Sequence, residues 1–282
     1  MTEQYTVLRR FRHGAAHQLL CLKYDSYIGR AVELFGEYSE AEVDVFRAFV
    51  RPEDVCIDGG ALFGEHTLAL SDLCPAGHVI AFEPQRIPFQ LLCGNAQLNS
   101  ADNIDAERAA LGALEGHTRV EPLSPYSDSP WGLTKLSSHG DRVRIRTIDS
   151  LNLKRLDFVK LDLEGAEADA IVGGKETFIR CRPVLYVEYN YNRPAILATL
   201  AMCGYFNYWR HRAPMHRTPN YLGRPLPEGV TMPDPSDMLL AVPGAPSTGS
   251  NPVLPGWWFT ESGRDFPAWL AAHSFERIEG AQ

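Results

Sequence analysis

The sequence lacks the features that mark secreted, membrane-spanning or zinc-binding proteins. The six cysteines are spread over 282 residues without a Cys-x-x-Cys pair, so neither a zinc site nor a disulfide framework is indicated. No apolar run approaches the roughly 20 residues of a membrane-spanning helix. The first residues also lack the apolar stretch of a secretory signal. We therefore expect a cytoplasmic protein with no membrane contact.

Positive charge is also scarce. The chain has 27 lysines and arginines against 35 aspartates and glutamates, which gives a net charge of −8. Domains that bind nucleic acids usually carry clustered basic residues that contact the phosphates. The charge balance predicts that no nucleic acid is a partner.

What the sequence does contain is an alternation of strand-like and helix-like segments. The segments that we interpret as strands are 55–58, 78–84, 105–112, 157–163 and 183–190. Later helical segments are 88–100, 166–179 and 194–204. This order predicts an α/β fold with a doubly wound, mostly parallel sheet. In such sheets ligands bind beyond the carboxyl ends of the strands.

The N-terminal part, residues 1–50, is expected to be a hairpin followed by a helix that leads into the core. The helix is predicted at 39–50 from its apolar spacing. Ser39 and Glu42 lie three residues apart at its start, which is the pattern of a capping box.

The C-terminal part is rich in proline. Ten of the 20 prolines lie between Pro214 and Pro255, which predicts a long loop at 212–236 because proline continues neither a helix nor an inner strand. A last strand is expected at 236–243. We therefore expect a core at 51–245 and an aromatic-rich extension at 246–282.

The stretch "VCIDGGALFGEHTLALSDL" at 55–73 has the strand, glycine turn and helix that seat nucleotide-like cofactors. Its glycines, Gly59, Gly60 and Gly64, do not have the GxGxxG spacing of a dinucleotide site. Asp58 at the strand tip would repel a pyrophosphate by about 4 kcal/mol for charges ~4 Å apart. These features favour S-adenosylmethionine (SAM), which carries an ammonium and a sulfonium. Glu83, at the end of the next strand, can accept both ribose hydroxyls.

The stretches "GEYSEAEVDVF", "VCIDGGALFGEHT", "VIAFEP" and "RTIDSL" precede the segment "DFVKLDLEGAEADAIVGGKETF". Their combination resembles the FkbM family of SAM-dependent methyltransferases, bacterial enzymes that typically act on hydroxyl groups of secondary metabolites or glycans. The match runs from about residue 25 to about residue 210, and its most specific part is the D-x-E-G-x-E stretch at 162–167. The N-terminal hairpin and the proline-rich tail lie outside it.

The resemblance implies a class I methyltransferase (Rossmann-like) fold with a seven-stranded sheet, in which the final hairpin places one antiparallel strand. It implies that Asp58 and Gly60 hold the methionine end of SAM. Glu83 would then hold the ribose, and Ala110 would border the adenine. For Glu42 a contact with the methionine group and a purely capping role are both open. The turn and the resemblance together give the expected cofactor site, which is Glu42, Asp58, Gly59, Gly60, Gly64, His66, Thr67, Glu83, Ala110 and Asp162.

Two acidic residues at strand ends are the candidates for catalysis. Methyl transfer to an alcohol requires that the hydroxyl oxygen is aligned with the methyl group. It also requires a base that takes up the hydroxyl proton, or a metal ion that helps the hydroxyl to release it. Asp162 ends the fourth strand and Glu188 the fifth, and Asp162 is open to three roles, as base, Mg²⁺ ligand or second SAM contact. A site without metal is favoured, and the alternative ligand set is Asp162, Glu188 and Asn190. Glu167, at a helix start, is interpreted as structural, whereas the role of Glu164 is left open.

The residues after the fourth strand also bear on the acceptor. Methyltransferases that act on exocyclic base nitrogens resemble one another in a D/N-P-P-Y/F stretch there, whereas this chain reads "DLEGAE". We therefore expect O-methylation of a small molecule or glycan, with an acceptor wall formed by the loops at 124–132 and around Tyr221. The alternatives are an NAD(P)-dependent reductase of a doubly wound fold and a SAM-fold protein that binds without catalysis. A homodimer is left open.

Overall fold

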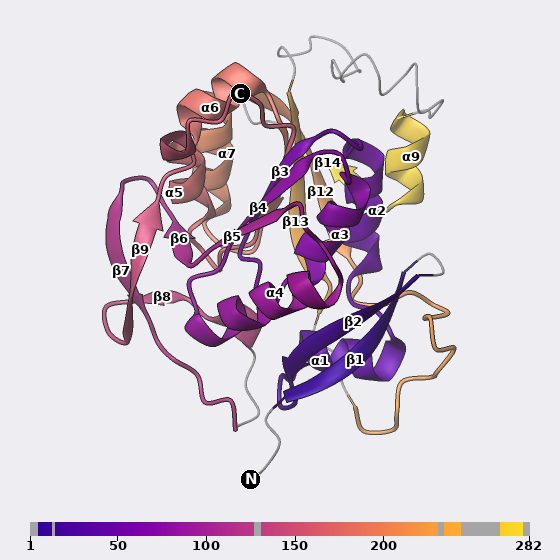
Figure 1. The fold of residues 1–282 in the computed structure, drawn as a ribbon. Coiled ribbons are helices and arrows are strands. Elements are labelled where there is room, and N and C mark those ends of the chain that lie inside the picture. The colour runs from indigo at the N-terminus through magenta and orange to yellow at the C-terminus, as the bar shows by residue number, and fades with distance from the viewer. Residues whose placement is uncertain (1–4, 13–14, 127–130, 231–233, 244–265, 279–282) are drawn as a thin grey trace.

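A twisted sheet lies at the centre of the protein, and helices cover both of its faces (Figure 1). The structure is a computed structural model that describes residues 5–12, 15–126, 131–230, 234–243 and 266–278. The sheet has eight strands in the order β14-β12-β13-β11-β10-β3-β4-β5. Their bounds are β3 Val55–Gly59, β4 His78–Phe82, β5 Ile104–Glu107, β10 Phe158–Leu161, β11 Val184–Glu188, β12 Tyr205–Ala213, β13 Ser236–Pro243 and β14 Phe275–Arg277.

The direction of the strands confirms the predicted fold class. β13 is antiparallel to β11 and β12, and β14 is antiparallel to β12. The strands from β11 to β5 are all parallel. The sheet is therefore mainly parallel and doubly wound, as expected. It has eight strands instead of seven, because the short strand β14 pairs with the outer edge of β12.

The helices form one layer on each face of the sheet. Along β11, Val184 and Tyr186 face a core shared with α2, α3 and α9, whereas Leu185 and Val187 face a core shared with α5, α6 and α7. This alternation follows from the period of two along a strand. The helix bounds are α2 Glu40–Phe49, α3 Glu65–Leu73, α4 Arg86–Leu98, α5 Glu167–Val172, α6 Lys175–Cys181, α7 Arg193–Met202 and α9 Phe266–Ala272.

Two elements that the sequence predicted as continuous are divided in the structure. The strand expected at 105–112 ends at Glu107, and the next residues form β6 (Ala109–Leu111) in a second sheet of order β6-β9-β7-β8. The other strands of that sheet are β7 Gly116–Val120, β8 Leu136–Ser137 and β9 Asp141–Arg146. The helix expected at 166–179 breaks between α5 and α6 at Gly173, where a Cβ would lie 2.1 Å from the Gly112 carbonyl oxygen.

The N-terminal extension lies against α3 and α4, near one end of the sheet (Figure 1). It consists of the hairpin β1 (Tyr5–Arg12) and β2 (Ala15–Leu22), followed by α1 (Ile28–Phe35). The predicted capping box at the start of α2 is wrong. Ser39 has a φ of 44° and makes no cap hydrogen bond, and its hydroxyl instead donates to Glu42 Oε1 at 2.7 Å.

The proline-rich segment after β12 packs on α1 and α2. Its His216 ring lies on Phe35, with 4.0 Å between the ring centroids. Arg217 makes a two-pronged contact with the Asp44 carboxylate at 2.8 and 3.0 Å. The Leu222 amide donates to the Phe35 carbonyl at 3.2 Å. This described part of the segment therefore braces the N-terminal extension.

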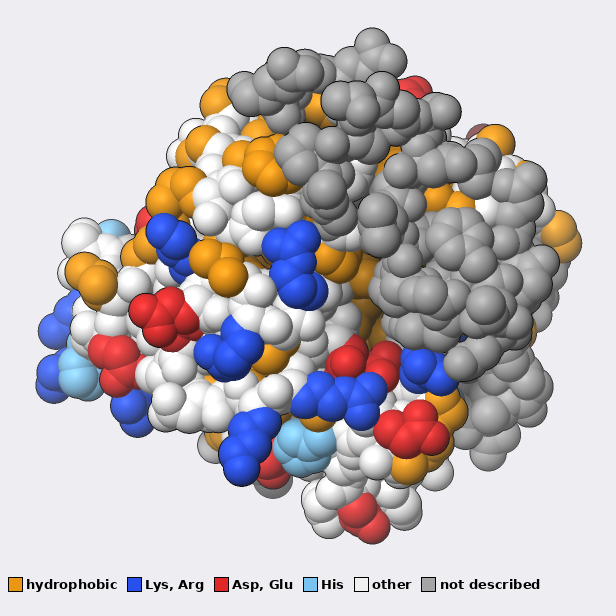
Figure 2. Space-filling view, turned by 90° about the horizontal axis from the view of Figure 1, so that it is seen from above, with side chains coloured by type: hydrophobic (Ala, Val, Ile, Leu, Met, Phe, Trp, Pro, Cys, Tyr) orange, Lys and Arg blue, Asp and Glu red, His pale blue; other side chains and the backbone are white. Residues whose placement is uncertain are grey.

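Charged side chains of both signs share the described part of one face of the protein (Figure 2). The face seen from above in Figure 2 carries basic and acidic side chains side by side, with hydrophobic ones between them. Within the described ranges, no helix has both the length and the apolar character needed to cross a membrane.

Candidate active site

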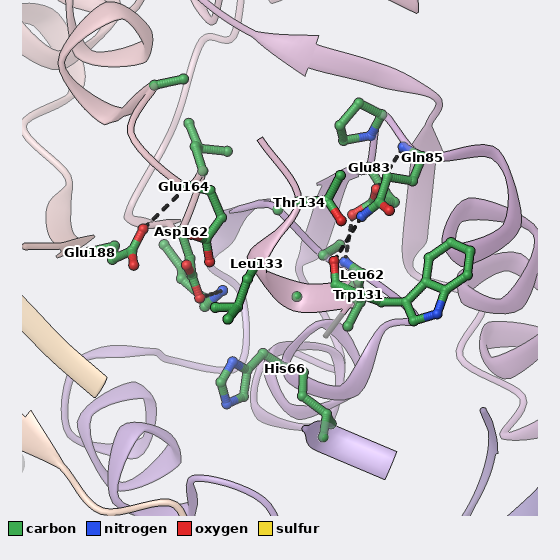
Figure 3. Close-up of a pocket in the computed structure, with 18 of the residues that line it drawn as sticks. Leu62, His66, Glu83, Gln85, Trp131, Leu133, Thr134, Asp162, Glu164 and Glu188 are labelled. Atoms are coloured by element: carbon green, nitrogen blue, oxygen red, sulfur yellow. Dashed lines mark hydrogen bonds and ion pairs between the residues drawn. The ribbon is translucent and has the colours of Figure 1, made fainter. Parts of the chain in front are cut away.

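A cavity of about 270 Å³ lies where β3, β4, β10 and β11 end, as expected for a ligand site in such a sheet (Figure 3). The residues predicted from the sequence that line it are Gly60, His66, Glu83, Ala110, Asp162, Glu188 and Asn190. The other predicted residues are buried outside this lining, and they are Glu42, Asp58, Gly59, Gly64 and Thr67.

Glu83 is held rigidly at one end of the cavity. The Leu62 amide donates to its Oε2 at 2.9 Å, and the Gln85 amide donates to its Oε1 at 2.7 Å. Each carboxylate oxygen still has a lone pair for a further donor. Burial raises the pKa of Glu83 to about 7, although the two backbone hydrogen bonds oppose this shift. The carboxyl group is thus suited to accept two neighbouring hydroxyls of a ligand.

The glycine turn is shaped by contacts within the chain. Gly60 has a φ of 78°, and a Cβ there would lie 1.9 Å from the Asp162 carbonyl oxygen. Gly64 has a φ of 89°, and its Cβ would lie 2.6 Å from Leu92. These glycines therefore let β3 approach β10 and let α3 approach α4. Gly60 is the only one of the three turn glycines that lines the cavity.

Asp58 at the tip of β3 bonds to two buried side chains. The Thr67 hydroxyl donates to Asp58 Oδ2 at 2.6 Å, and Lys160 Nζ lies 3.6 Å from Asp58 Oδ1. Lys160 also lies 3.3 Å from Asp162 Oδ2, at the cavity wall. Burial lowers the pKa of Lys160, but the charges of Asp162, Asp58 and Glu42 outweigh this and hold the pKa above its ordinary value. Lys160 is therefore a buried cation shared by two carboxylates.

Three carboxylates meet at the other end of the cavity. One ligand-type oxygen from each of Asp162, Glu164 and Glu188 lies within 4.8 Å of the other two. At that separation two charges repel by about 3 to 4 kcal/mol at an effective dielectric of about 20. Burial and the charge of Asp162 raise the pKa of Glu164 to about 8, with the Tyr191 hydroxyl opposing. Burial, Asp162 and Glu164 raise the pKa of Glu188 well above its ordinary value.

The neighbours of this cluster have supporting contacts. The Asn190 amide donates to Glu188 Oε1 at 2.7 Å, so it orients that carboxyl group. Glu167 accepts hydrogen bonds from the Leu163 and Gly165 amides at 2.8 and 3.1 Å. Glu167 thus fixes the turn between β10 and α5, which is the structural role expected for it.

The roof of the cavity comes from segments without a sequence motif. The 3₁₀ helix η1 (Trp131–Leu133) and Thr134 line it on one side. Tyr27 and Tyr38 line it near His66, with 6.1 Å between the two tyrosine ring centroids and 5.6 Å between Tyr38 and His66. Of the two loops expected at the acceptor wall, the one at 124–132 reaches the cavity through Trp131 and Gly132. Tyr221 is not among the lining residues.

Comparisons with known proteins agree with this architecture. The model of the methyltransferase FkbM domain matches residues 58–207, which is more than half of the chain. The chain belongs to the FkbM methyltransferase family. The family is one of SAM-dependent methyltransferases, and the match favours this prediction over that of an NAD(P)-dependent reductase.

Individual relatives of this FkbM-family chain are distant. It is 24% identical to Methyltransferase 1 of Beauveria bassiana (strain ARSEF 2860) over 178 residues, which cover 53% of this chain and 72% of that protein. It resembles the crystal structure of methyltransferase FkbM from Methylobacillus flagellatus KT with a TM-score of 0.44 and 18% identity, over 71% of this chain and 50% of that chain. This chain thus spans about half the length of the Methylobacillus protein. It also resembles M. jannaschii TYW2 in complex with AdoMet with a TM-score of 0.45 and 15% identity, over 86% of each chain.

Sequence reasoning missed several residues of the site. Tyr27, Tyr38 and Trp131 come from segments that reach the cavity only through the fold, and nothing in their local sequence marks them. Lys160 did leave a signal, because it is the one charged residue in the buried strand "FVKL" of β10. A lysine on such a strand is rarely fully buried unless it is paired, and this one is paired with Asp58 and Asp162.

Proposed function

We propose that this FkbM-family protein transfers the methyl group of SAM to a hydroxyl oxygen of a small molecule or glycan. The observation that carries the proposal is the arrangement of the cavity, which joins the fixed carboxyl group of Glu83 to the carboxylates of Asp162 and Glu188. A ligand that spans the cavity meets a carboxyl group at one end, which can accept hydrogen bonds from two neighbouring hydroxyls. At the other end it meets negative charge. SAM has a ribose diol and positively charged groups in that order.

The lining fits the remaining parts of the cofactor. Ala109, Ala110 and Leu111 form a small apolar wall near Glu83, which suits an adenine ring. Gly60 and Asp162 line the path toward the carboxylate end, where the methionine part would lie. When bound, SAM supplies an electrophilic methyl group that passes from sulfur to the acceptor oxygen as the carbon–sulfur bond breaks. The role of the chain is to align that oxygen and receive its proton.

Asp162 is the base in this proposal. Its side chain is 32% exposed, so it is open to an acceptor, and Lys160 holds its Oδ2 atom. Burial and the neighbouring carboxylates raise the pKa values of Glu164 and Glu188, which favours Asp162 as the base over either of them. The hydroxyl proton would therefore pass to Asp162 as the new carbon–oxygen bond forms.

The test combines SAM binding with turnover. Calorimetry should show that the chain binds SAM, and incubation with methyl-labelled SAM and a panel of hydroxylated acceptors should yield a labelled ether. Asp162→Asn should lower kcat at saturating SAM by about 10² to 10⁴, the usual share of general base catalysis. Asp169→Asn, the same change at an exposed position on α5, is the matched control.

Three results would argue against the proposal. Unchanged turnover in Asp162→Asn would remove Asp162 from the chemistry. SAM binding without transfer to any acceptor of the panel would favour a binding module. Binding of NAD(P)H in place of SAM would restore the reductase alternative.

A further inference from the structure

The carboxylates of Asp162, Glu164 and Glu188 form a cluster larger than a single base requires. Their oxygens lie within 4.8 Å of one another, and the residues come from the ends of two adjacent strands and the turn after β10 (Figure 3). Like charges this close repel, so all three ionise together only if a cation lies between them.

Glu164 has one carboxylate oxygen without a hydrogen-bond donor, although its carboxyl group also interacts with the Tyr191 hydroxyl. Its side chain is 9% exposed, and it lines the cavity. Its Oε2 atom is buried and has no hydrogen-bond partner among the described residues. A buried carboxylate oxygen without a donor is costly, and a bound cation would remove that cost.

The nearby cations of the chain are engaged elsewhere. Lys160 is buried beneath Asp162 and lies between its Oδ2 and Asp58, which leaves the other Asp162 oxygen to face a cation. Lys135 is exposed and lies over the Tyr191 ring, with its Nζ 3.8 Å from the ring centroid. Among the described residues Lys160 pairs only with Asp58 and Asp162, whereas the charge of Lys135 acts on Glu164 and lowers its pKa without outweighing burial and Asp162.

We propose that Asp162, Glu164 and Glu188 hold a hard divalent cation of the Mg²⁺ or Mn²⁺ type. Three clustered carboxylates are the oxygen ligands that such ions prefer, and water completes their coordination. This ligand set adds Glu164 to the Asp162 and Glu188 expected from the sequence, and Asn190, whose amide nitrogen donates to Glu188, also lines the cavity. The ion would lower the pKa of an acceptor hydroxyl, which would then release its proton to Asp162 or to water. That last role rests on the proposed function, whereas the binding site does not.

Binding can be measured on the full chain without SAM or acceptor. Titration with Mn²⁺, followed by electron paramagnetic resonance and by calorimetric competition with Mg²⁺, should reveal one site per chain with a Kd below about 1 mM. Glu164→Gln and Glu188→Gln should each weaken Mn²⁺ binding by about tenfold or more, because each loses a charged ligand. Glu176→Gln, the same change at an exposed position on α6, is the matched control and should bind Mn²⁺ as the parent does.

The outcomes separate this site from the proposed methyl transfer. Absence of saturable Mn²⁺ binding up to about 5 mM, or equal binding by the parent, Glu164→Gln and Glu188→Gln, would overturn the metal site. If the two variants instead lose SAM affinity and the parent binds no Mn²⁺, the cluster serves the cofactor and the metal proposal is wrong, while the proposed function stands. If the parent binds Mn²⁺ but no SAM, the metal site stands and the proposed function fails.

Discussion

The carboxyl group of Glu83 offers a test of cofactor binding that depends on pH. Burial raises its pKa to about 7, so the group changes charge in the range where the protein can be studied. Only the ionised form can accept a hydrogen bond from each ribose hydroxyl while it also accepts those of Leu62 and Gln85. Glu83→Gln removes the charge and turns one acceptor atom into a donor. The cost of this variant in SAM affinity should therefore increase with pH.

The size of the effect follows from the pKa and the hydrogen bonds. With a pKa of about 7 for Glu83, about one tenth of the group is ionised at pH 6 and about nine tenths at pH 8. At pH 8 the loss of charge-assisted hydrogen bonds should weaken SAM binding by about 1.5 to 3 kcal/mol, which is about 10- to 100-fold. At pH 6 the ratio of the Kd of the variant to that of the parent should be about tenfold smaller than at pH 8, because Glu83 is already protonated in most of the parent protein.

The assay is calorimetric titration of the parent and of Glu83→Gln with SAM at pH 6, 7 and 8. The amino group of SAM also titrates near this range, but the ratio of the two Kd values at each pH cancels any change in the ligand itself. Glu53→Gln, the same change at an exposed position, should give a ratio near one at every pH. A penalty that is absent, or equal at pH 6 and pH 8, would refute the assignment of the ribose contact to an ionising Glu83.

Two further changes test the chain beneath the cavity. Lys160→Met should lower the free energy of unfolding by about 3 to 5 kcal/mol in urea titrations, because Asp58 and Asp162 lose their shared buried cation. Lys154→Met, the same change at an exposed position, is the control. A loss below about 1 kcal/mol in Lys160→Met would contradict the argument. Gly60→Ala should abolish SAM binding and lower thermal stability, since its Cβ would lie 1.9 Å from the Asp162 carbonyl oxygen. Gly116→Ala, where a Cβ has no atom within 4 Å, should behave as the parent, and equal behaviour of the two variants would show that the turn can rearrange.

The strand ends were predictable because each is marked by a local pattern. An apolar run that stops at an acid places Asp58, Glu83, Asp162 and Glu188 at one edge of a parallel sheet, and the structure has all four residues there. The glycines were predictable as a turn, but their partners were not. The atoms that exclude a Cβ at Gly60 belong to Asp162, about a hundred residues later, and no local pattern encodes that contact.

The roof of the site was beyond the reach of pattern reasoning for a related reason. The chain leaves the main sheet after β5, and the place of Trp131 over the cavity depends on where the second sheet lies. Tyr27 and Tyr38 belong to the extension, whose position is fixed by contacts such as those of Asn95 with the Leu20 and Phe63 backbone. Such placements are tertiary, so periodicity and motifs carry no information about them.

Asp58 lies at the predicted strand tip, but its side chain contacts other residues of the chain. An acid at the tip of β3 was expected to attract a cationic cofactor directly, but Asp58 is fully buried and binds Thr67 and Lys160. Because the charge of Lys160 is shared with Asp58, it does not fully neutralise Asp162, which lies one strand away and lines the cavity. The cavity therefore keeps a negative surface at this point. A phosphate there would still be repelled, and a sulfonium or ammonium attracted. The electrostatic argument for SAM over a dinucleotide therefore rests on Asp162 in place of Asp58.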